Sequence, residues 1–548
     1  MIMKDGGSRT APSRRRSGRA VFIAAVAILA LAVGAGISGA STGKKSAVNP
    51  TLNWAIGTNP PSLFNGFYFG TEGSMMFSLT THHILEPGVF GDPKTSSGSA
   101  VESWKAVTPT KYVYKVKSGI KFSDGTTMTA SDVAFSLNVH RDKKTGSKMF
   151  SFFSNVRSVG SKGNTVTVLL FKPDSKWQFT PAASPGLVYS KADYAKKGAS
   201  FGTPSGLPVG TGPYKWVEYA PNSRVVLERN PFWKGVKYPW DRIVFPLIPD
   251  SNARLLALQS GQIDGTFAVP PNDLPLWLKA PNMKVGTFNS GGWRGFSIDT
   301  EDGPFKDVNV RRAIAYSIDK ATITEALTSS RGQVLEGLPP LLFIRALLPK
   351  AEIEAAMKKV PTYPYSIDKA KAELAKSPYP KGFDTTLNVP AGSAPILLLS
   401  QVFQQGLAKI GINVKLNLMP GPQRFQVILD HKPNLGIQVL GQGPDSPHPM
   451  DKPDLLYRSS KAAPGYENSA NYKNATVDKL IDEGLSSSDL KVGARNALTI
   501  MQSVNRDVPY IPVFSIPGAS AVEPGWKFKS SLGPFYYNQI WLQHLIAK

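Results

Sequence analysis

Two aspartates in the segment SGIKFSDGTTMTASDVAFSL, residues 118–137, are the first residues whose spacing could support catalysis. Local structure accounts for both of them. Asp124 precedes Gly125 in a turn, where aspartate is favoured early and glycine tolerates a positive φ. Asp132 follows Thr129, the expected helix N-cap, by three residues, which is the spacing of a capping box near the positive end of the helix. We therefore interpret both aspartates as structural.

A second possible catalytic feature is the SxxK pattern, which occurs at Ser317–Lys320 and Ser366–Lys369. This pattern carries the nucleophile of penicillin-recognising enzymes. The partner motif SDN is absent from the sequence, and Ser317–Lys320 lies in the segment 310–323, whose apolar spacing is helical. A penicillin-recognising hydrolase is therefore the weakest alternative function.

Metal and thiol chemistry find little support in the composition. The chain has no cysteine, which excludes disulfides and thiolate metal sites. No pair of histidines has the spacing of a zinc helix such as HExxH. We expect no metal site and no cofactor. The histidines are His82, His83, His140, His431, His448 and His544.

The composition describes a globular chain with a strongly basic surface. Of the 548 residues, 41% are hydrophobic and 19% are charged, and the formal net charge is +24. Basic residues do not gather in a block beyond the first 20 residues. We therefore expect a solvated basic surface, near a membrane or cell wall, and no nucleic-acid partner.

Residues 1–45 have the features of a signal peptide or an N-terminal membrane anchor. A cluster of arginines at 14–19 precedes the apolar run 20–37, and small residues follow it. The run is longer than a typical signal core and close to the shortest spanning helix, so cleavage after about Ala40 and retention both stay open. Either way the body is expected outside the cytoplasm, membrane-anchored by 20–37 or released into the periplasm or cell envelope.

The body alternates expected strands and helices. β-branched and aromatic residues indicate strands at 112–116, 165–171 and 224–228, and apolar spacing indicates helices at 252–261 and 310–323. The helix within 397–410 ends at Gly411, and residues 412–418 then alternate as a strand. A helix that leads into a strand through one glycine is typical of α/β proteins.

Several of these segments, in this order, resemble the extracellular solute-binding proteins of family 5, the dipeptide, oligopeptide and nickel receptors of ABC importers. The similarity extends from about residue 50 to the C-terminus. The segments that carry it are YKVKSGIKFSDGTTMTASDVAFSL (114–137), VGTGPYKWVEYAPNSRVVLERNPFW (209–233), RLLALQSGQIDG (254–265), GPFKDVNVRRAIAYSIDK (303–320), YSIDKAKAELAKSPYPKGF (365–383), 397–418, NYKNATVDKLIDEG (471–484) and VPYIPVF (508–514).

The resemblance implies an α/β, two-lobed periplasmic-binding-protein-like fold (type II, cluster C) with an extra subdomain in the first lobe and a ligand cleft between the lobes. The first lobe would comprise 46–84, 204–295 and 520–548, with the family-specific subdomain at 85–203. The second lobe would comprise 296–519. Such a receptor closes on its ligand, because the ligand binds the closed form better than the open one.

The implied function is capture of a peptide or similar small polar solute, and its delivery to the permease and ATPase subunits of an importer. No enzymatic reaction is implied, and we expect a monomer. Alternatives are a receptor of the same fold for a non-peptide ligand, such as an oligosaccharide or a metal chelate, and a membrane-anchored scaffold without a transport role.

The resemblance also implies a binding residue. Asp445, in GQGPDSPHP (441–449), takes the position of the aspartate that pairs with a peptide's ammonium group. Two neighbours depart from the family pattern, because Gln442 replaces a tryptophan and His448 replaces a second aspartate. An alternative role for Asp445 is that of a turn residue.

Five further residues could contact a ligand or simply pack. Trp293 could stack on a ligand, and Arg294 could form a bidentate pair with a carboxylate. Phe67 and Tyr68 could line the cleft. Arg345, in the apolar segment PLLFIRALLP, is a candidate for binding a substrate carboxylate.

Overall fold

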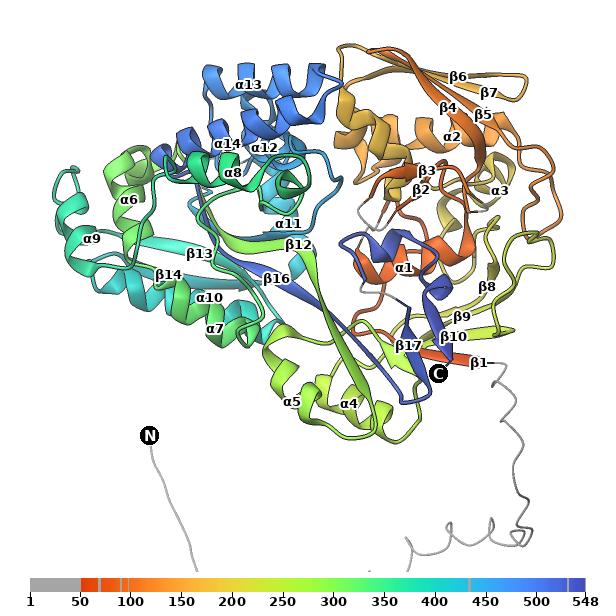
Figure 1. The fold of residues 1–548 in the computed structure, drawn as a ribbon. Coiled ribbons are helices and arrows are strands. Elements are labelled where there is room, and N and C mark those ends of the chain that lie inside the picture. Colours follow the sequence, from red (N-terminus) through yellow and green to blue (C-terminus); the bar gives the residue numbers. More distant parts are fainter. Residues whose placement is uncertain are drawn as a thin grey trace, which may run out of the picture. The chain divides into compact units, whose positions relative to one another are not determined.

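A ten-stranded sheet extends through both lobes of the protein in the computed structural model (Figure 1). The structure describes residues 51–67, 70–88, 91–96, 98–431, 435–529 and 532–547. The strands lie in the order β14 (Asn413–Met419), β13 (Asp384–Pro390), β15 (Ile437–Gln442), β12 (Lys284–Ile298), β16 (Tyr510–Val522), β11 (Gly265–Thr266), β1 (Thr51–Ala55), β10 (Arg242–Pro246), β9 (Arg224–Arg229) and β8 (Tyr214–Ala220).

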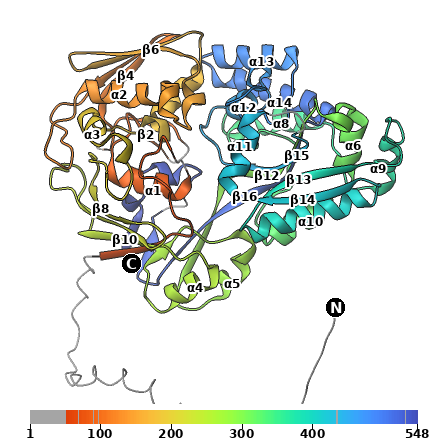
Figure 2. The same cartoon turned by 180° about the vertical axis from the view of Figure 1, so that it is seen from behind.

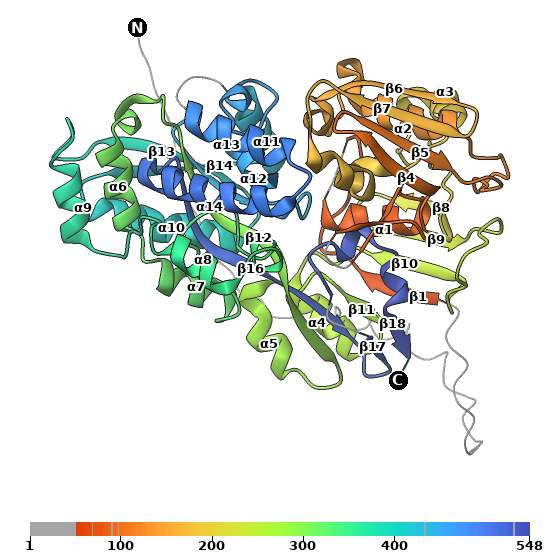
Figure 3. The same cartoon turned by 45° about the horizontal axis from the view of Figure 1, so that its top comes forward.

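The two longest strands, β12 and β16, connect the lobes. They pair antiparallel along their length, and their register shifts between Asn289 and Gly292. On one side of this irregularity Phe288 packs with Tyr536 of the first lobe, and on the other side Phe296 belongs to the core of the second lobe. Figure 3 shows both ribbons passing from one lobe to the other.

The second lobe has helices on both faces of its sheet. Successive residues such as Tyr510 and Ile511 enter different cores, as expected for a strand buried on both faces. One face packs against α6 (Val308–Tyr316), α7 (Lys320–Thr328), α9 (Ile367–Leu374) and α10 (Ala394–Ala408). The other packs against α8 (Lys350–Met357), α11 (Gly421–Asp430), α12 (Asp451–Leu456), α13 (Ala475–Ser486) and α14 (Leu490–Asp507).

The C-terminal residues return to the first lobe, where the rings of Trp541 and Trp54 have centroids 4.5 Å apart. This lobe packs β1 and β8–β10 against α1 (Thr71–Thr80), and the C-terminal hairpin β17 (Trp526–Phe528) and β18 (Leu545–Ala547) joins the same core. Figure 2 shows the C-terminal end of the chain beside β10. A neighbouring core contains α4 (Ser251–Gln259) and α5 (Leu274–Lys279).

A separate four-stranded sheet forms the additional part of the first lobe. Its order is β4 (Val101–Thr108), β5 (Lys111–Val116), β7 (Thr165–Leu170) and β6 (Val156–Lys162). Helix α2 (Ala130–Arg141) covers it, and Tyr114, Val133 and Trp177 lie in the shared core. Helix α3 (Lys191–Lys197), strands β2 (Glu86–Pro87) and β3 (Pro93–Lys94), and the 3-10 helix η3 (Ser175–Ala182) also belong to this part.

The structural roles of the two opening aspartates are confirmed. The Asp124 carboxylate accepts the backbone N–H of Thr126 at 2.9 Å, as in an Asx turn. The Asp132 carboxylate accepts the backbone N–H and the hydroxyl of Thr129 and, from a distant segment, the N–H of Lys191.

Most expected elements are confirmed, at β5, β7, β9, α4 and the α10–β14 unit. The single helix expected at 310–323 is wrong, because the chain forms α6 and then α7. The Asp319 side chain caps α7 by accepting the N–H of Thr322, and the α6 helix has already ended at Ser317. Local capping therefore interrupts a continuous apolar periodicity.

Residues 1–45, with their predicted signal or anchor, lie outside the described part of the chain. Within the described residues, no helix combines the length and apolar character needed to cross a membrane.

Candidate functional site

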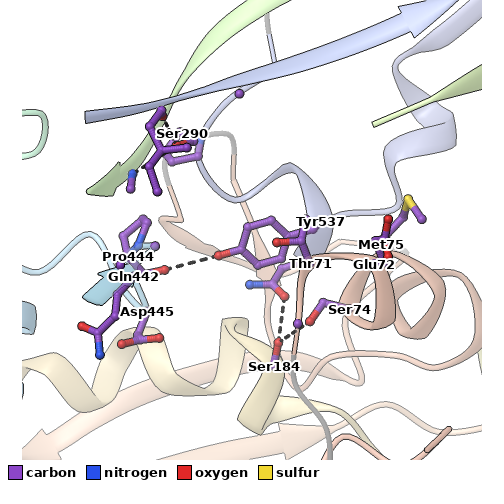
Figure 4. A pocket seen from close by; sticks show the side chains of 18 of the residues that line it. Thr71, Glu72, Ser74, Met75, Ser184, Ser290, Gln442, Pro444, Asp445 and Tyr537 are labelled. Carbon is purple, nitrogen blue, oxygen red and sulfur yellow. Dashed lines mark hydrogen bonds between the residues drawn. The ribbon is translucent and has the colours of Figure 1, made fainter. Parts of the chain in front are cut away.

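A cavity of about 900 Å³ lies between the lobes. The first lobe contributes Phe67, Glu72, Ser184 and Tyr537 to its wall, and the second lobe contributes residues of β15, α11 and the loops beside them. Figure 4 shows Gln442 and Asp445 on one side of this space and Ser184 with Glu72 on the other.

Much of the cavity wall is apolar. Aromatic rings and methionines from separate segments face it, and they suit apolar groups of a ligand. These residues include Phe67, Met75, Met149, Phe152, Phe267, Phe425, Tyr536 and Tyr537.

Of the described residues proposed from the sequence, Phe67, Gln442 and Asp445 line the cavity, whereas Trp293, Arg294 and Arg345 do not. Tyr68 lies outside the described residues.

Trp293 is fully buried in the second-lobe core, because the alternation of β12 directs its side chain toward Tyr510. The indole N–H finds no hydrogen-bond partner among the described residues. Arg294, the next residue, is half-buried behind Gly441, and burial lowers its pKa to about 10. Arg345 is exposed in the short 3-10 helix η8 (Ile344–Ala346).

Asp445 already has a partner within the protein. The Lys452 ammonium lies 2.7 Å from the Asp445 carboxylate and 3.5 Å from that of Asp451. Burial opposes the charge of Lys452, but the two carboxylates outweigh burial and raise its pKa. The lysine side chain is only 4% exposed, so this is a largely desolvated ion pair.

Glu467 is a cavity residue that the sequence analysis did not identify. Its carboxylate accepts a hydrogen bond from the side-chain amide of Gln442. It forms no ion pair with any of the described residues. Burial, followed by the nearby charge of Asp445, raises its pKa to about 7. No motif around Glu467 signals this position, because the chain between Gln442 and Glu467 must fold back to bring them together.

A buried ion pair joins the two lobes beside the cavity. Lys176, in η3 of the first lobe, places its ammonium 2.5 Å from the Asp454 carboxylate of α12. Lys461 and Arg458, both of the second lobe, pair with the same carboxylate. Burial opposes ionisation of Asp454, but the three cations outweigh burial and hold its pKa well below the usual range. We call the Lys176–Asp454 pair the latch.

A hydrogen-bond chain lies next to the latch. His448 accepts the N–H of Met450 at Nδ1, so its Nε2–H donates to Ser175 Oγ at 2.9 Å. Ser175 Oγ donates in turn to the carbonyl of Leu485. Burial, together with the charge of Lys176, lowers the pKa of His448 to about 3, so the ring is neutral. His448, which replaces an aspartate of the family pattern, therefore lies at a contact between the lobes.

The serines of the SxxK patterns have structural roles. Ser317 donates to the carbonyl of Ile314 at the end of α6, and Ser366 caps α9 by accepting the N–H of Lys369. KTG, a further partner motif of penicillin-recognising enzymes, is present at 144–146. It lies in the first lobe, in a turn after α2, whereas both serines are in the second lobe.

Comparison with known proteins agrees with this architecture. The model of the bacterial extracellular solute-binding proteins, family 5 Middle, matches residues 97–464. The oligopeptide-binding protein AppA of Bacillus subtilis is 27% identical over 532 residues, covering 91% of this chain and 93% of its own. Heme-binding protein A of Haemophilus influenzae is 27% identical, covering 89% and 91%.

Among solved structures, the periplasmic binding protein DppA of Helicobacter pylori, in complex with the peptide STSA, superposes with a TM-score of 0.78. It is 21% identical, and the match covers 91% of this chain and 98% of that one. This match supports the fold. With the family match over residues 97–464, it follows that the chain belongs to the bacterial extracellular solute-binding proteins of family 5.

Proposed function

We propose that this protein captures a peptide or similar small polar solute by closure of its lobes and delivers it, chemically unchanged, to an ABC importer. The observation that carries this proposal is the cavity of about 900 Å³ whose wall comes from both lobes. Because the wall is complete only when the lobes meet, a ligand there favours the closed form over the open one. The volume lies at the upper end of the roughly 300–1,000 Å³ common for small-molecule sites.

The chemistry of the cavity suits a peptide. Apolar and aromatic residues could hold side chains of varied shape, while Asp445, Glu467 and Gln442 form a polar corner. Two relatives are named for different ligands, an oligopeptide and heme, and the DppA structure is in complex with the peptide STSA. We favour a peptide because a carboxylate-containing corner next to apolar walls is complementary to an amine on a chain with apolar side groups.

The partners and location follow from the same proposal. The closed receptor would dock as a monomer, outside the cytoplasm, onto the permease of an importer that is driven by ATPase subunits, with residues 20–37 as the receptor's membrane anchor. Intact N-terminal sequence in protein extracted from membranes would support the anchor, whereas a mature N-terminus near Ser41 would contradict it.

We propose one lobe boundary from the hydrophobic cores that the side chains of β12 enter. Phe288 packs with the first lobe and Phe296 with the second, so the first crossing lies near the register shift at 289–292. This crossing is a few residues before the expected boundary at 295.

Native mass spectrometry tests the function directly. Protein purified without denaturation, mixed with a pool of tetrapeptides, should retain bound masses of the tetrapeptides, and its melting temperature should rise with the pool concentration. If no tetrapeptide is retained and the melting temperature stays constant, the peptide ligand class is wrong.

A further inference from the structure

The carboxylate that the family resemblance assigns to a ligand's ammonium group is already neutralised. Lys452 lies between Asp445 and Asp451, and Asp451 also accepts the backbone N–H of Asp445 and the hydroxyl of Ser446. A ligand cation at Asp445 would have to compete with a buried ammonium that cannot leave the protein. Breaking a buried pair leaves one charge uncompensated, so this competition is unfavourable.

One acceptor beside this pair remains open. Glu467 lines the cavity, and its carboxylate is bound by the amide of Gln442 and by no cation of the described residues. The side-chain carbonyl of Gln442 is itself fully buried and finds no hydrogen-bond partner within the described part of the chain. A buried carboxylate without a cation is costly, so a cationic donor from a ligand would stabilise this arrangement.

We propose that Glu467 receives the cationic group of the bound solute, while Asp445 is held by Lys452. This inference rests on the proposed function and names the residue that selects its ligand. The surroundings favour a cation, because the triad of Asp445, Lys452 and Asp451 contains two carboxylates and one ammonium.

The proposal has a consequence for protons. Burial and the charge of Asp445 raise the pKa of Glu467 to about 7, Lys452 and Lys461 oppose this rise, and Asp451 adds to it. Tyr510 also faces Glu467, and burial keeps its phenol neutral by raising its pKa. A ligand cation would stabilise the carboxylate, so Glu467 would release its proton on binding.

The direction in which the binding affinity changes with pH distinguishes Glu467 from the ligand's own amino group. If binding requires the carboxylate, the apparent affinity should rise about fivefold between pH 6 and pH 7, given a free pKa of about 7. Deprotonation of a peptide's own amino group, with a pKa of about 8, would weaken binding as the pH rises. The two effects therefore have opposite directions.

The experiment uses the full chain with two probes: a tetrapeptide pool with free amino termini and the same pool after N-acetylation. Native mass spectrometry identifies the strongest binder, and calorimetry in two buffers of different ionisation enthalpy then counts the protons released. We expect the free pool to bind, the acetylated pool to lose at least tenfold in affinity, and a proton to be released.

The variant Glu467→Gln should abolish the rise of affinity with pH. Glu72→Gln is the matched control, because Glu72 also lines the cavity but its carboxylate accepts the backbone N–H groups of Gly57 and Thr58. Whatever its effect on affinity, it should keep the pH dependence.

Equal binding of the acetylated pool, or a wild-type affinity that does not rise with pH, overturns the inference while the receptor function stands. The wild-type measurement decides the question even if Glu467→Gln does not fold. Absence of binding by both pools would reject the peptide ligand class and the inference with it.

Discussion

The latch offers the sharpest test of closure, because its two residues lie in different lobes. In the variant Lys176→Met, Asp454 loses the ammonium at 2.5 Å but keeps Lys461 at 2.8 Å and Arg458 at 2.6 Å. Asp454 stays paired, so the loss between the lobes is that of one charge-assisted hydrogen bond, about 1.5–3 kcal/mol. Because the bond crosses between lobes, the closed population should fall relative to the open one by roughly 10- to 150-fold.

The absence of cysteine makes this change measurable. Spin labels on cysteines introduced at exposed Ser161, in β6, and exposed Thr499, in α14, report one distance between the lobes. Pulsed electron resonance on ligand-free protein should show the short distance in the parent and a shift to longer distances in Lys176→Met. Lys172→Met is the matched control, since Lys172 is exposed and forms no ion pair with the described residues.

An unchanged distance distribution in Lys176→Met, or the same shift in Lys172→Met, would refute the latch. A comparison with Asp454→Asn adds a second criterion. That variant leaves the ammonium groups of Lys176 and Lys461 buried without this carboxylate, which costs about 3–5 kcal/mol. Since Lys461 and Asp454 belong to the same lobe, its cost should also appear in global unfolding, more strongly than that of Lys176→Met.

Three further predictions concern stability. Trp293→Ala should lower the free energy of unfolding in denaturant by about 3–5 kcal/mol, because a fully buried ring is removed. Its affinity for the tetrapeptide pool should stay unchanged. A loss of affinity without a loss of stability would identify Trp293 as a ligand contact. Thr129→Ala should cost about 0.5–2 kcal/mol by removing the cap of α2, and an unchanged unfolding midpoint would contradict that role. The raised pKa of Glu467, about 7 against an ordinary 4.5, predicts that ligand-free protein loses stability as the pH rises from about 4.5 to about 7. In this pH range the folded state keeps a proton on Glu467 that the unfolded state has released. The melting temperature of Glu467→Gln should therefore depend less on pH than that of the parent protein. An identical pH dependence would exclude Glu467 as the cause of the stability loss.

Short-range features were predictable from the sequence. The turn at Asp124, the cap formed by Thr129 and Asp132, and the helix–glycine–strand unit around Gly411 each depend on residues a few positions apart. The error at 310–323 is of the same kind, because the cap at Asp319 competes locally with the apolar periodicity. The order of such segments along the chain was sufficient to recognise the family.

The sequence alone could not predict which side chains contact the cleft residues in the folded protein. The sequence placed Asp445 in a binding segment, but the tertiary structure decided that Lys452 neutralises it, that Gln442 meets Glu467, and that Lys176 reaches Asp454 over a separation of 278 residues. The physical reason is that the charge state of a buried group depends on every charge around it. Local propensity is therefore determined by the sequence itself, whereas the electrostatics of the cleft appear only once distant segments pack together.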